Sequence, residues 1–252
     1  MSRVKSCWQK VSVFSSRRWI RPYNASYLPC LRRAAMSKKR MTRKLLLALL
    51  FTFSSACSHG LDLPLTDANF KNCVAALAAK KNWQNLADIT AIECHSKKIT
   101  SLAGIEHFTQ LQKLSLYNNQ LTDATLEKLP LLRHINLAKN KITQVTLGEL
   151  PALEELYIFG NKMTALDLNA LPTLKLLKIN DNKLLQFTYR DLPALEKIYM
   201  FNNAVEHVDI YHLPALKYMD ARQNPMPDPL YEEMDKLTGV TFLHDGNAED
   251  WQ

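Results

Sequence analysis

One pattern of apolar and polar positions recurs along the chain. Each unit has leucine at its first position, apolar residues at its fourth and sixth, and asparagine at its ninth. Successive units start 21 residues apart, at Leu111, Leu132, Leu153, Leu174, Leu195 and Leu216. The alternation indicates a short strand with one buried face. Because so short a unit cannot bury that face alone, the pattern predicts parallel strands stacked along a solenoid.

Weaker units extend the array at both ends. A degenerate unit starts at Ile89, and a partial unit starts at Leu237. Five units end in Leu-Pro, from Leu129-Pro130 to Leu213-Pro214. The second half of each unit is short, so we expect extended or 3₁₀ backbone there rather than a long helix.

The repeated asparagines have an expected structural role. An amide side chain carries two donors and an acceptor. Pointed inward, it can pair with backbone groups of adjacent coils that would otherwise be buried without a partner. The residues are Asn119, Asn140, Asn161, Asn182, Asn203 and Asn224.

Both ends of the array carry helical patterns. Residues 66–83 predict a helix that begins at Thr66 or Asp67. Its expected apolar stripe is Phe70, Cys73, Val74 and Leu77. At the other end, Asp228 as N-cap and Pro229 predict a second helix. We expect it to end near Gly239, before a closing strand at 240–243 and a fraying tail.

Charge is distributed unevenly. The net charge of +8 invites a nucleic-acid partner. However, residues 1–56 contain 13 Lys or Arg and no acidic residue, so the remainder carries a net charge of −5. We therefore expect no nucleic-acid binding.

The basic segment leads into a short apolar run. Residues 45–53 read LLLALLFTF, which is too short to span a bilayer, since that needs roughly 20 residues. Ser54-Ser55-Ala56 and Cys57 follow. This resembles a bacterial lipoprotein signal, which implies lipidation of Cys57, and Ser58 by the same resemblance favours the outer membrane. The alternatives are an ordinary secretory signal, or a transit peptide within residues 1–35.

These features predict the domain organisation of the chain. The segments are a basic N-terminal extension (1–40), a lipoprotein signal (41–56), a linker (57–66), an N-terminal helical cap (67–88), repeats (89–226) and a C-terminal cap (227–252). If translation starts at Met36 or Met41, the signal has a normal length and the extension lies upstream of it.

Residues 89–243 resemble the leucine-rich repeat family, in particular its internalin-like class of 21–22 residues. The resemblance implies an α/β solenoid with short parallel strands on a concave face, a mostly irregular or 3₁₀ convex side, and α-helical N- and C-caps. Cys94 occupies an inward strand position equivalent to Leu116, and Cys73 lies on the helical stripe facing it. Export would permit a disulfide between them; the alternative is two buried free thiols.

The resemblance also implies partner binding on the concave face. We expect this face to present Tyr117, Tyr157, Phe159, Lys178, Asn180, Tyr199, Phe201, Tyr218 and Arg222. Exposed aromatics among mixed charges are typical of interfaces, although strands also favour aromatics in general. We expect a monomer that binds a protein or peptide. The alternatives are a glycan or peptidoglycan ligand, or a scaffold like the leucine-rich regulatory subunit of a protein phosphatase.

No catalytic motif is found in the sequence. The seven histidines form no recognisable pattern, and the sequence contains no G-x-S-x-G, H-E-x-x-H or phosphate loop. We therefore expect no enzyme activity, no cofactor and no metal.

Overall fold

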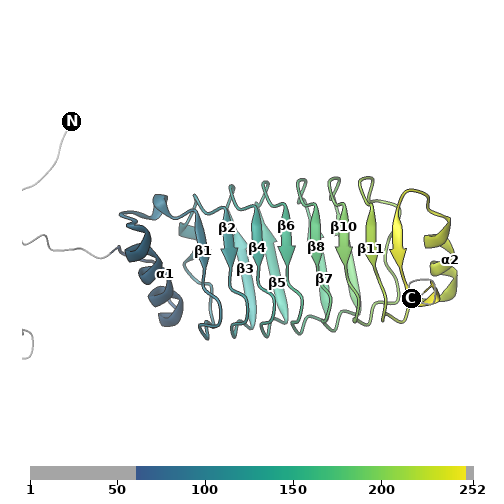
Figure 1. Ribbon diagram of the computed structural model, residues 1–252, viewed down its shortest axis with the longest axis horizontal. Helices are drawn as coiled ribbons and strands as arrows, with labels where there is room; N and C mark the ends of the chain where they lie inside the picture. Colours follow the sequence, from purple (N-terminus) through teal and green to yellow (C-terminus); the bar gives the residue numbers. More distant parts are fainter. Residues whose placement is uncertain (1–60, 248–252) are drawn as a thin grey trace, which may run out of the picture. The chain divides into compact units, whose positions relative to one another are not determined.

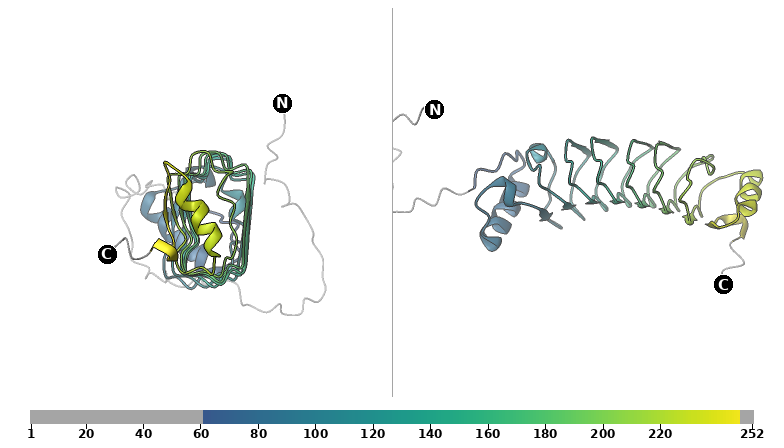
Figure 2. Two further views of the ribbon diagram at one scale, coloured as in Figure 1. Left: turned by 90° about the vertical axis from the view of Figure 1, so that its right-hand side faces the viewer. Right: turned by 90° about the horizontal axis from the view of Figure 1, so that it is seen from above.

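The computed structural model describes residues 61–247, in which eight short strands form one parallel sheet (Figure 1). In spatial order the strands are β1 (Ala91–Glu93), β2 (Lys113–Ser115), β4 (His134–Asn136), β6 (Glu155–Tyr157), β8 (Leu176–Lys178), β10 (Lys197–Tyr199), β11 (Tyr218–Asp220) and β12 (Thr241–Leu243). The predicted solenoid of parallel strands is confirmed. Viewed along the stack, successive coils superimpose (Figure 2, left).

The register of the sheet follows the apolar repeat. Leu114 aligns with Ile135, Ile135 with Leu156, and Leu156 with Leu177. Each of these central residues is fully buried. One 21-residue repeat is therefore one coil, and every coil adds one strand to the sheet and one layer to the core.

The opposite side of the stack differs from the expected irregular or 3₁₀ backbone. It contains β3 (Asp123–Glu127) paired with β5 (Gln144–Gly148), and β7 (Ala165–Asn169) paired with β9 (Gln186–Arg190). Alternating burial explains these strands, since Leu166 and Leu168 of β7 point inward while their neighbours are exposed. The extended backbone expected in the second half of each unit is confirmed, but the mostly irregular or 3₁₀ backbone that the resemblance implies is wrong for these four coils. Within residues 61–247, 3₁₀ turns occur at η1 (Leu86–Asp88) and η2 (Ile105–His107).

The repeated asparagines join adjacent coils. Asn161 Oδ1 accepts a hydrogen bond from Ile142 N at 3.0 Å. Its Nδ2 donates to Leu137 O at 3.1 Å and to Ile158 O at 2.9 Å. The equivalent acceptor bonds are made by Asn119, Asn140, Asn182, Asn203 and Asn224. Each asparagine thus satisfies backbone groups of its own coil and of the preceding one.

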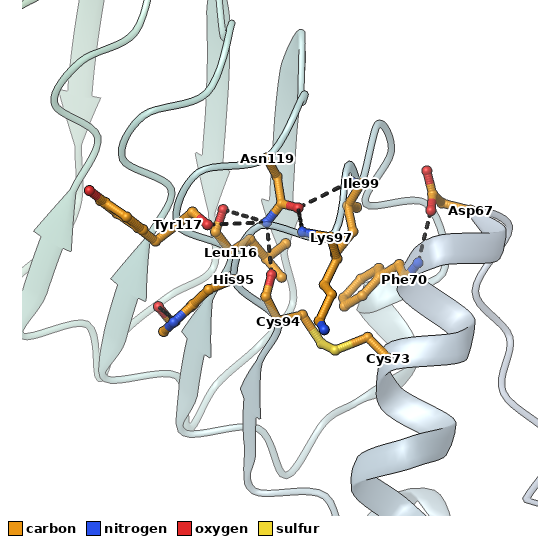
Figure 3. Close-up of a disulfide and its surroundings, with 11 residues drawn as sticks. Asp67, Phe70, Cys73, Cys94, His95, Lys97, Ile99, Leu116, Tyr117 and Asn119 are labelled. Carbon is orange, nitrogen blue, oxygen red and sulfur yellow. Dashed lines mark hydrogen bonds between the residues drawn. A yellow bond between two sulfur atoms is a disulfide. The ribbon is translucent and has the colours of Figure 1, made fainter.

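Helix α1 (Ala68–Lys81) lies at the N-terminal end of the stack (Figure 1). Asp67 caps it, accepting from Phe70 N at 2.8 Å, and also accepts from Thr100 N at 2.8 Å. The predicted disulfide between Cys73 and Cys94 is present (Figure 3). It joins the helix covalently to the first strand of the sheet, next to the buried Phe70.

The described part of the expected linker belongs to the folded unit. Leu63 and Leu65 are only 2% and 4% exposed, and Thr66 N donates to Ala103 O at 3.3 Å. Gly104 has φ +99°, and a Cβ on it would lie 2.3 Å from Pro64 O. The chain therefore packs closely on the first coils from residue 63 onward. Residues 57–60 lie outside the described part.

Helix α2 (Asp228–Lys236) lies at the other end (Figure 1). Pro227 rather than Asp228 is its N-cap residue, and the closing strand is Thr241–Leu243. The expected fraying does not begin at residue 244. His244 is 1% exposed and stacks on Tyr231, with ring centroids 4.5 Å apart.

Candidate binding face

The solvent side of the eight-stranded sheet is here called the sheet face. Its central row consists of the last residues of the strands, which include Asn136, Tyr157, Lys178, Tyr199 and Asp220. A second row lies two residues later in each coil and includes Tyr117, Ala138, Phe159, Asn180, Phe201 and Arg222. Backbone hydrogen bonds keep this second row in register, for example from Gly160 N to Asn180 O at 3.1 Å. That the face is concave stays a prediction.

Lys178 occupies the middle of the central row, between two tyrosines on the neighbouring strands. Its Nζ lies 4.5 Å from the ring centroid of Tyr199 and 5.6 Å from that of Tyr157. Both distances are within the range of a cation–π interaction. The aromatic rings therefore hold the ammonium group in a defined position on the face.

Tyr157 is also held by groups on its other side. Its hydroxyl donates to Glu155 Oε2 at 3.0 Å, and His134 Nδ1 lies 2.8 Å from the same oxygen. The His134 ring centroid is 5.1 Å from that of Tyr157. Burial, together with the hydrogen bond to Glu155, raises the pKa of Tyr157 to about 12. The hydroxyl therefore remains protonated at physiological pH.

Tyr199 continues the cluster toward the C-terminal end. Its ring centroid lies 5.2 Å from that of Tyr218 on the adjacent strand. Beyond it, Arg222 Nη2 donates to Asp220 Oδ2 at 2.8 Å, and Arg222 Nε donates to Asp220 Oδ1 at 2.9 Å. This bidentate pair engages the Arg222 guanidinium within the chain.

The second row differs from the expected ligand surface at Asn180. Phe159 and Phe201 are half-buried, but Asn180 is only 7% exposed. Its Nδ2 donates to Asp181 Oδ2 at 2.5 Å. Asn180 therefore offers little surface to a ligand, because the side chain is buried and its donor bonds the next residue of the turn.

Tyr117 lies apart from the main aromatic cluster. The small residue Ala138 separates it from Phe159 in the second row. Its neighbours are Lys139, with Nζ 5.6 Å from the ring centroid, and His95, with a ring-centroid distance of 6.1 Å. The structure thus brings together Tyr157, Lys178, Tyr199 and Tyr218, here called the aromatic cluster, and leaves Tyr117 at its margin.

A groove at the Leu-Pro edge of the stack was not predicted. Its volume is about 1070 Å³. It is lined by Pro151, Pro172, Pro193, Pro214, Tyr189 and Tyr211, among others. Tyr189 donates to Asp209 O, and Tyr211 is 61% exposed. The only sequence signal for this groove is the recurrence of Leu-Pro at the end of five units.

Residues 61–247 contain neither a candidate metal site nor a candidate membrane-spanning helix. This part of the chain has no group of three or more His, Cys, Asp or Glu residues placed to hold a metal ion. None of its helices has the length and apolar character needed to cross a bilayer.

Comparison with known proteins identifies the type of repeat. The family model for the leucine rich repeat matches residues 109–163. The same 21-residue coil continues on both sides of this segment. The matched segment therefore has the sequence pattern of a leucine-rich repeat. No protein with a curated description matches the chain.

Several solved structures are similar to the chain. Internalin C2 from Listeria monocytogenes is 19% identical, with 72% of this chain and 94% of that chain covered and a TM-score of 0.47. Another Listeria monocytogenes internalin is 19% identical over 71% and 69%, with a TM-score of 0.44. A leucine-rich repeat protein of Leptospira interrogans is 21% identical over 57% and 51%, with a TM-score of 0.36. The chain thus spans about half the length of the Leptospira protein.

Proposed function

We propose that this protein is a recognition module that binds a protein or peptide partner through its sheet face. The aromatic cluster is the observation that carries the proposal. It groups three tyrosines and a lysine on four adjacent strands, at the centre of a face rimmed by charged residues. Large amphipathic side chains held rigidly at the centre of a polar rim are typical of interface hot spots.

The packing of the rings favours a peptide over a glycan. A sugar stacks on a free aromatic face. Tyr199 already has Lys178 Nζ on its ring at 4.5 Å and the Tyr218 ring at 5.2 Å. Tyr157 has His134 and Lys178 beside it. What remains for a ligand is ring edges, hydroxyls and an ammonium group, which suit the mixed polar and apolar surface of a polypeptide.

A display experiment tests this proposal. A random peptide library is selected on the full-length chain, and the recovered peptides are titrated against Y157A/Y199A. We expect affinity to fall at least about tenfold, since hot-spot aromatics each contribute about 1–2 kcal/mol or more. Tyr211→Ala is the matched control, because that tyrosine is exposed but lies in the Leu-Pro groove. Equal affinity of Y157A/Y199A and Tyr211→Ala would refute the proposal.

We also propose that the protein is lipid-anchored through Cys57 in a bacterial cell envelope, at the outer membrane. The support is the sequence: a basic segment, nine apolar or near-apolar residues, three small residues and the cysteine. Cys57→Ser should move the protein from the membrane fraction to the soluble fraction, whereas Ser58→Ala should not. Mass spectrometry of the mature N-terminus should find acylated Cys57. An unmodified Cys57 in the mature protein would contradict the anchor.

A further inference from the structure

The carboxylates along the strands of the sheet face lie close to basic side chains. Each acidic residue at an outward strand position, or at the position just before a strand, lies within ion-pair distance of a basic side chain. The pairs are Glu93 with Lys113, Glu154 with Arg133 and Lys175, Glu155 with His134, Glu196 with Lys217, and Asp220 with Arg222. Apart from Glu155, whose partner is a histidine that carries charge only when protonated, each of these carboxylates is paired with a lysine or an arginine.

Two lysines on the same strands have no such partner. Lys178 and Lys197 make no ion pair with any residue in 61–247, and their ammonium groups donate no hydrogen bond to this part of the chain. An ammonium group has three donors. On the strands of the face, the positive charge without an ionic partner in residues 61–247 is thus on Lys178 of β8, within the aromatic cluster, and on Lys197 of β10.

Lys178 differs from an ordinary surface lysine in its surroundings. The Tyr157 and Tyr199 rings lie on either side of its ammonium group, and the side chain is half-buried. Because the rings already restrict the side chain, Lys178 loses less conformational entropy on pairing than an ordinary surface lysine does. They also exclude water from two sides, which strengthens any hydrogen bond made to the group. The ammonium group is therefore preorganised to bind a ligand that approaches from solvent.

The charge of a partner decides whether covering Lys178 is favourable. A neutral surface would bury the ammonium group without a counter-ion, which costs free energy. A basic surface would add like-charge repulsion. A carboxylate would replace the lost water with a charge-assisted hydrogen bond. Only the last arrangement keeps every charge on the covered face paired.

We propose that the sheet face recognises an acidic peptide segment, with a Glu or Asp side chain of the partner bound to Lys178 between Tyr157 and Tyr199. The hydroxyl of Tyr199 makes no hydrogen bond within residues 61–247, so it is a further donor for the same segment. This proposal rests on the proposed function of the face and adds the chemistry of the partner. Lys178 is then the residue that determines specificity.

The test uses acidic peptides selected on the full-length chain from a random display library. Each peptide is synthesised with its Glu and Asp residues and with Gln and Asn in their place. We expect selected peptides to be enriched in Glu or Asp, and the Gln/Asn forms to bind about tenfold more weakly, as for loss of one charge-assisted hydrogen bond. Lys178→Met keeps the length of the side chain and removes its charge. It should weaken the acidic peptides about tenfold and abolish the preference over the Gln/Asn forms.

Lys162→Met is the matched control. Lys162 is exposed and unpaired within the described residues, and it follows Asn161 in a turn away from the cluster. It changes the net charge by the same amount and should leave affinity and preference unchanged. Equal loss in both variants, or a preserved acidic preference in Lys178→Met, would overturn the proposal. If Y157A/Y199A still abolishes binding in that case, the face is a binding site without acidic specificity. If Y157A/Y199A has no effect, the proposed function itself fails.

Discussion

Asn161 and Ile142, which belong to consecutive coils, are joined inside the stack by a 3.0 Å hydrogen bond from the Ile142 amide to the Asn161 side-chain oxygen. Both residues are buried, so no solvent is available to replace the bond. The same side chain donates to carbonyl groups of both coils. One amide therefore satisfies three buried backbone groups. Its loss would leave the Ile142 amide without a partner, whereas Leu137 O and Ile158 O would each keep one donor, from Asn140 and Asn182.

Asn161→Ala should destabilise the protein by about 2 kcal/mol, because the buried Ile142 amide loses its partner and two buried carbonyl groups each lose one of two donors. Urea denaturation followed by far-UV circular dichroism measures the difference. Asn169→Ala is the control, since Asn169 is exposed on β7, and it should change stability by less than about 0.5 kcal/mol. Equal effects of the two substitutions would show that the asparagines do not stabilise the stack in this way.

The disulfide should contribute about 3 kcal/mol, as expected for a loop closed over a sequence separation of 21 residues. Dithiothreitol should lower the urea midpoint of the wild-type protein by the corresponding amount. A C73S/C94S variant should start at the lower midpoint and not respond to the reductant. A reductant effect of the same size in the variant would assign it to something other than this bond.

Asp67 should make stability depend on pH in the acidic range. Burial opposes ionisation, but hydrogen bonds from the Thr100 side chain and from the Phe70 and Thr100 amides outweigh it and lower the pKa of Asp67. A lowered pKa means that the folded state binds its proton less readily than the unfolded state. The stabilisation is therefore complete above the unfolded pKa of about 4 and is lost as the pH falls through the folded value.

Asp67→Asn is expected to cost about 1 kcal/mol at pH 7, because one amide oxygen cannot replace two carboxylate oxygens at this helix cap. The difference from wild type should shrink below about pH 4. Asp62→Asn, at an exposed position nearby, serves as the control and should show no such convergence. A wild-type advantage that persists unchanged to pH 2 would contradict the assignment.

Alanine substitutions at two glycines with positive φ distinguish the cost of backbone strain from the cost of a steric clash. An alanine at Gly239 (φ +87°) would meet no atom within 4 Å, so Gly239→Ala should cost about 1 kcal/mol from the left-handed backbone alone. At Gly104 the new Cβ would also clash with Pro64 O, so Gly104→Ala should cost about 3 kcal/mol or more. Thermal unfolding of both variants checks this order; similar losses would mean that the 61–66 segment does not pack on the first coils.

The coil spacing and the core could be predicted from sequence because each follows from a strict repeat. Leu114, Ile135 and Leu156 recur every 21 residues, and only parallel stacking buries them all. The strands β3, β5, β7 and β9 on the opposite side of the stack could not be predicted in this way. Segments such as 165–169 alternate over only five residues, which does not distinguish a strand from an irregular turn.

The binding face was harder to predict than the core, because outward residues depend on their neighbours. The repeat places Asn180 and Arg222 on the same row, but it does not reveal that Asp181 accepts the Asn180 amide or that Asp220 engages Arg222. Likewise, the leucines at 61, 63 and 65 alternate over too few residues to predict that Leu63 and Leu65 are buried. These outcomes are set by local side-chain contacts rather than by the repeat.

The disulfide also makes the two ends of the stack differ in their resistance to a pulling force. Each coil contacts mainly its neighbours, so a solenoid under tension loses coils one after another from an end. At the N-terminal end a covalent bond holds α1 to the first strand, whereas at the C-terminal end non-covalent contacts, such as the stacking of His244 on Tyr231, hold the last strand in place. Peeling therefore starts from α2, and it reaches Tyr218 and Tyr199 while the N-terminal coils are still folded. A strong enough pull would release a bound partner before it unfolded the half of the protein nearest Cys73.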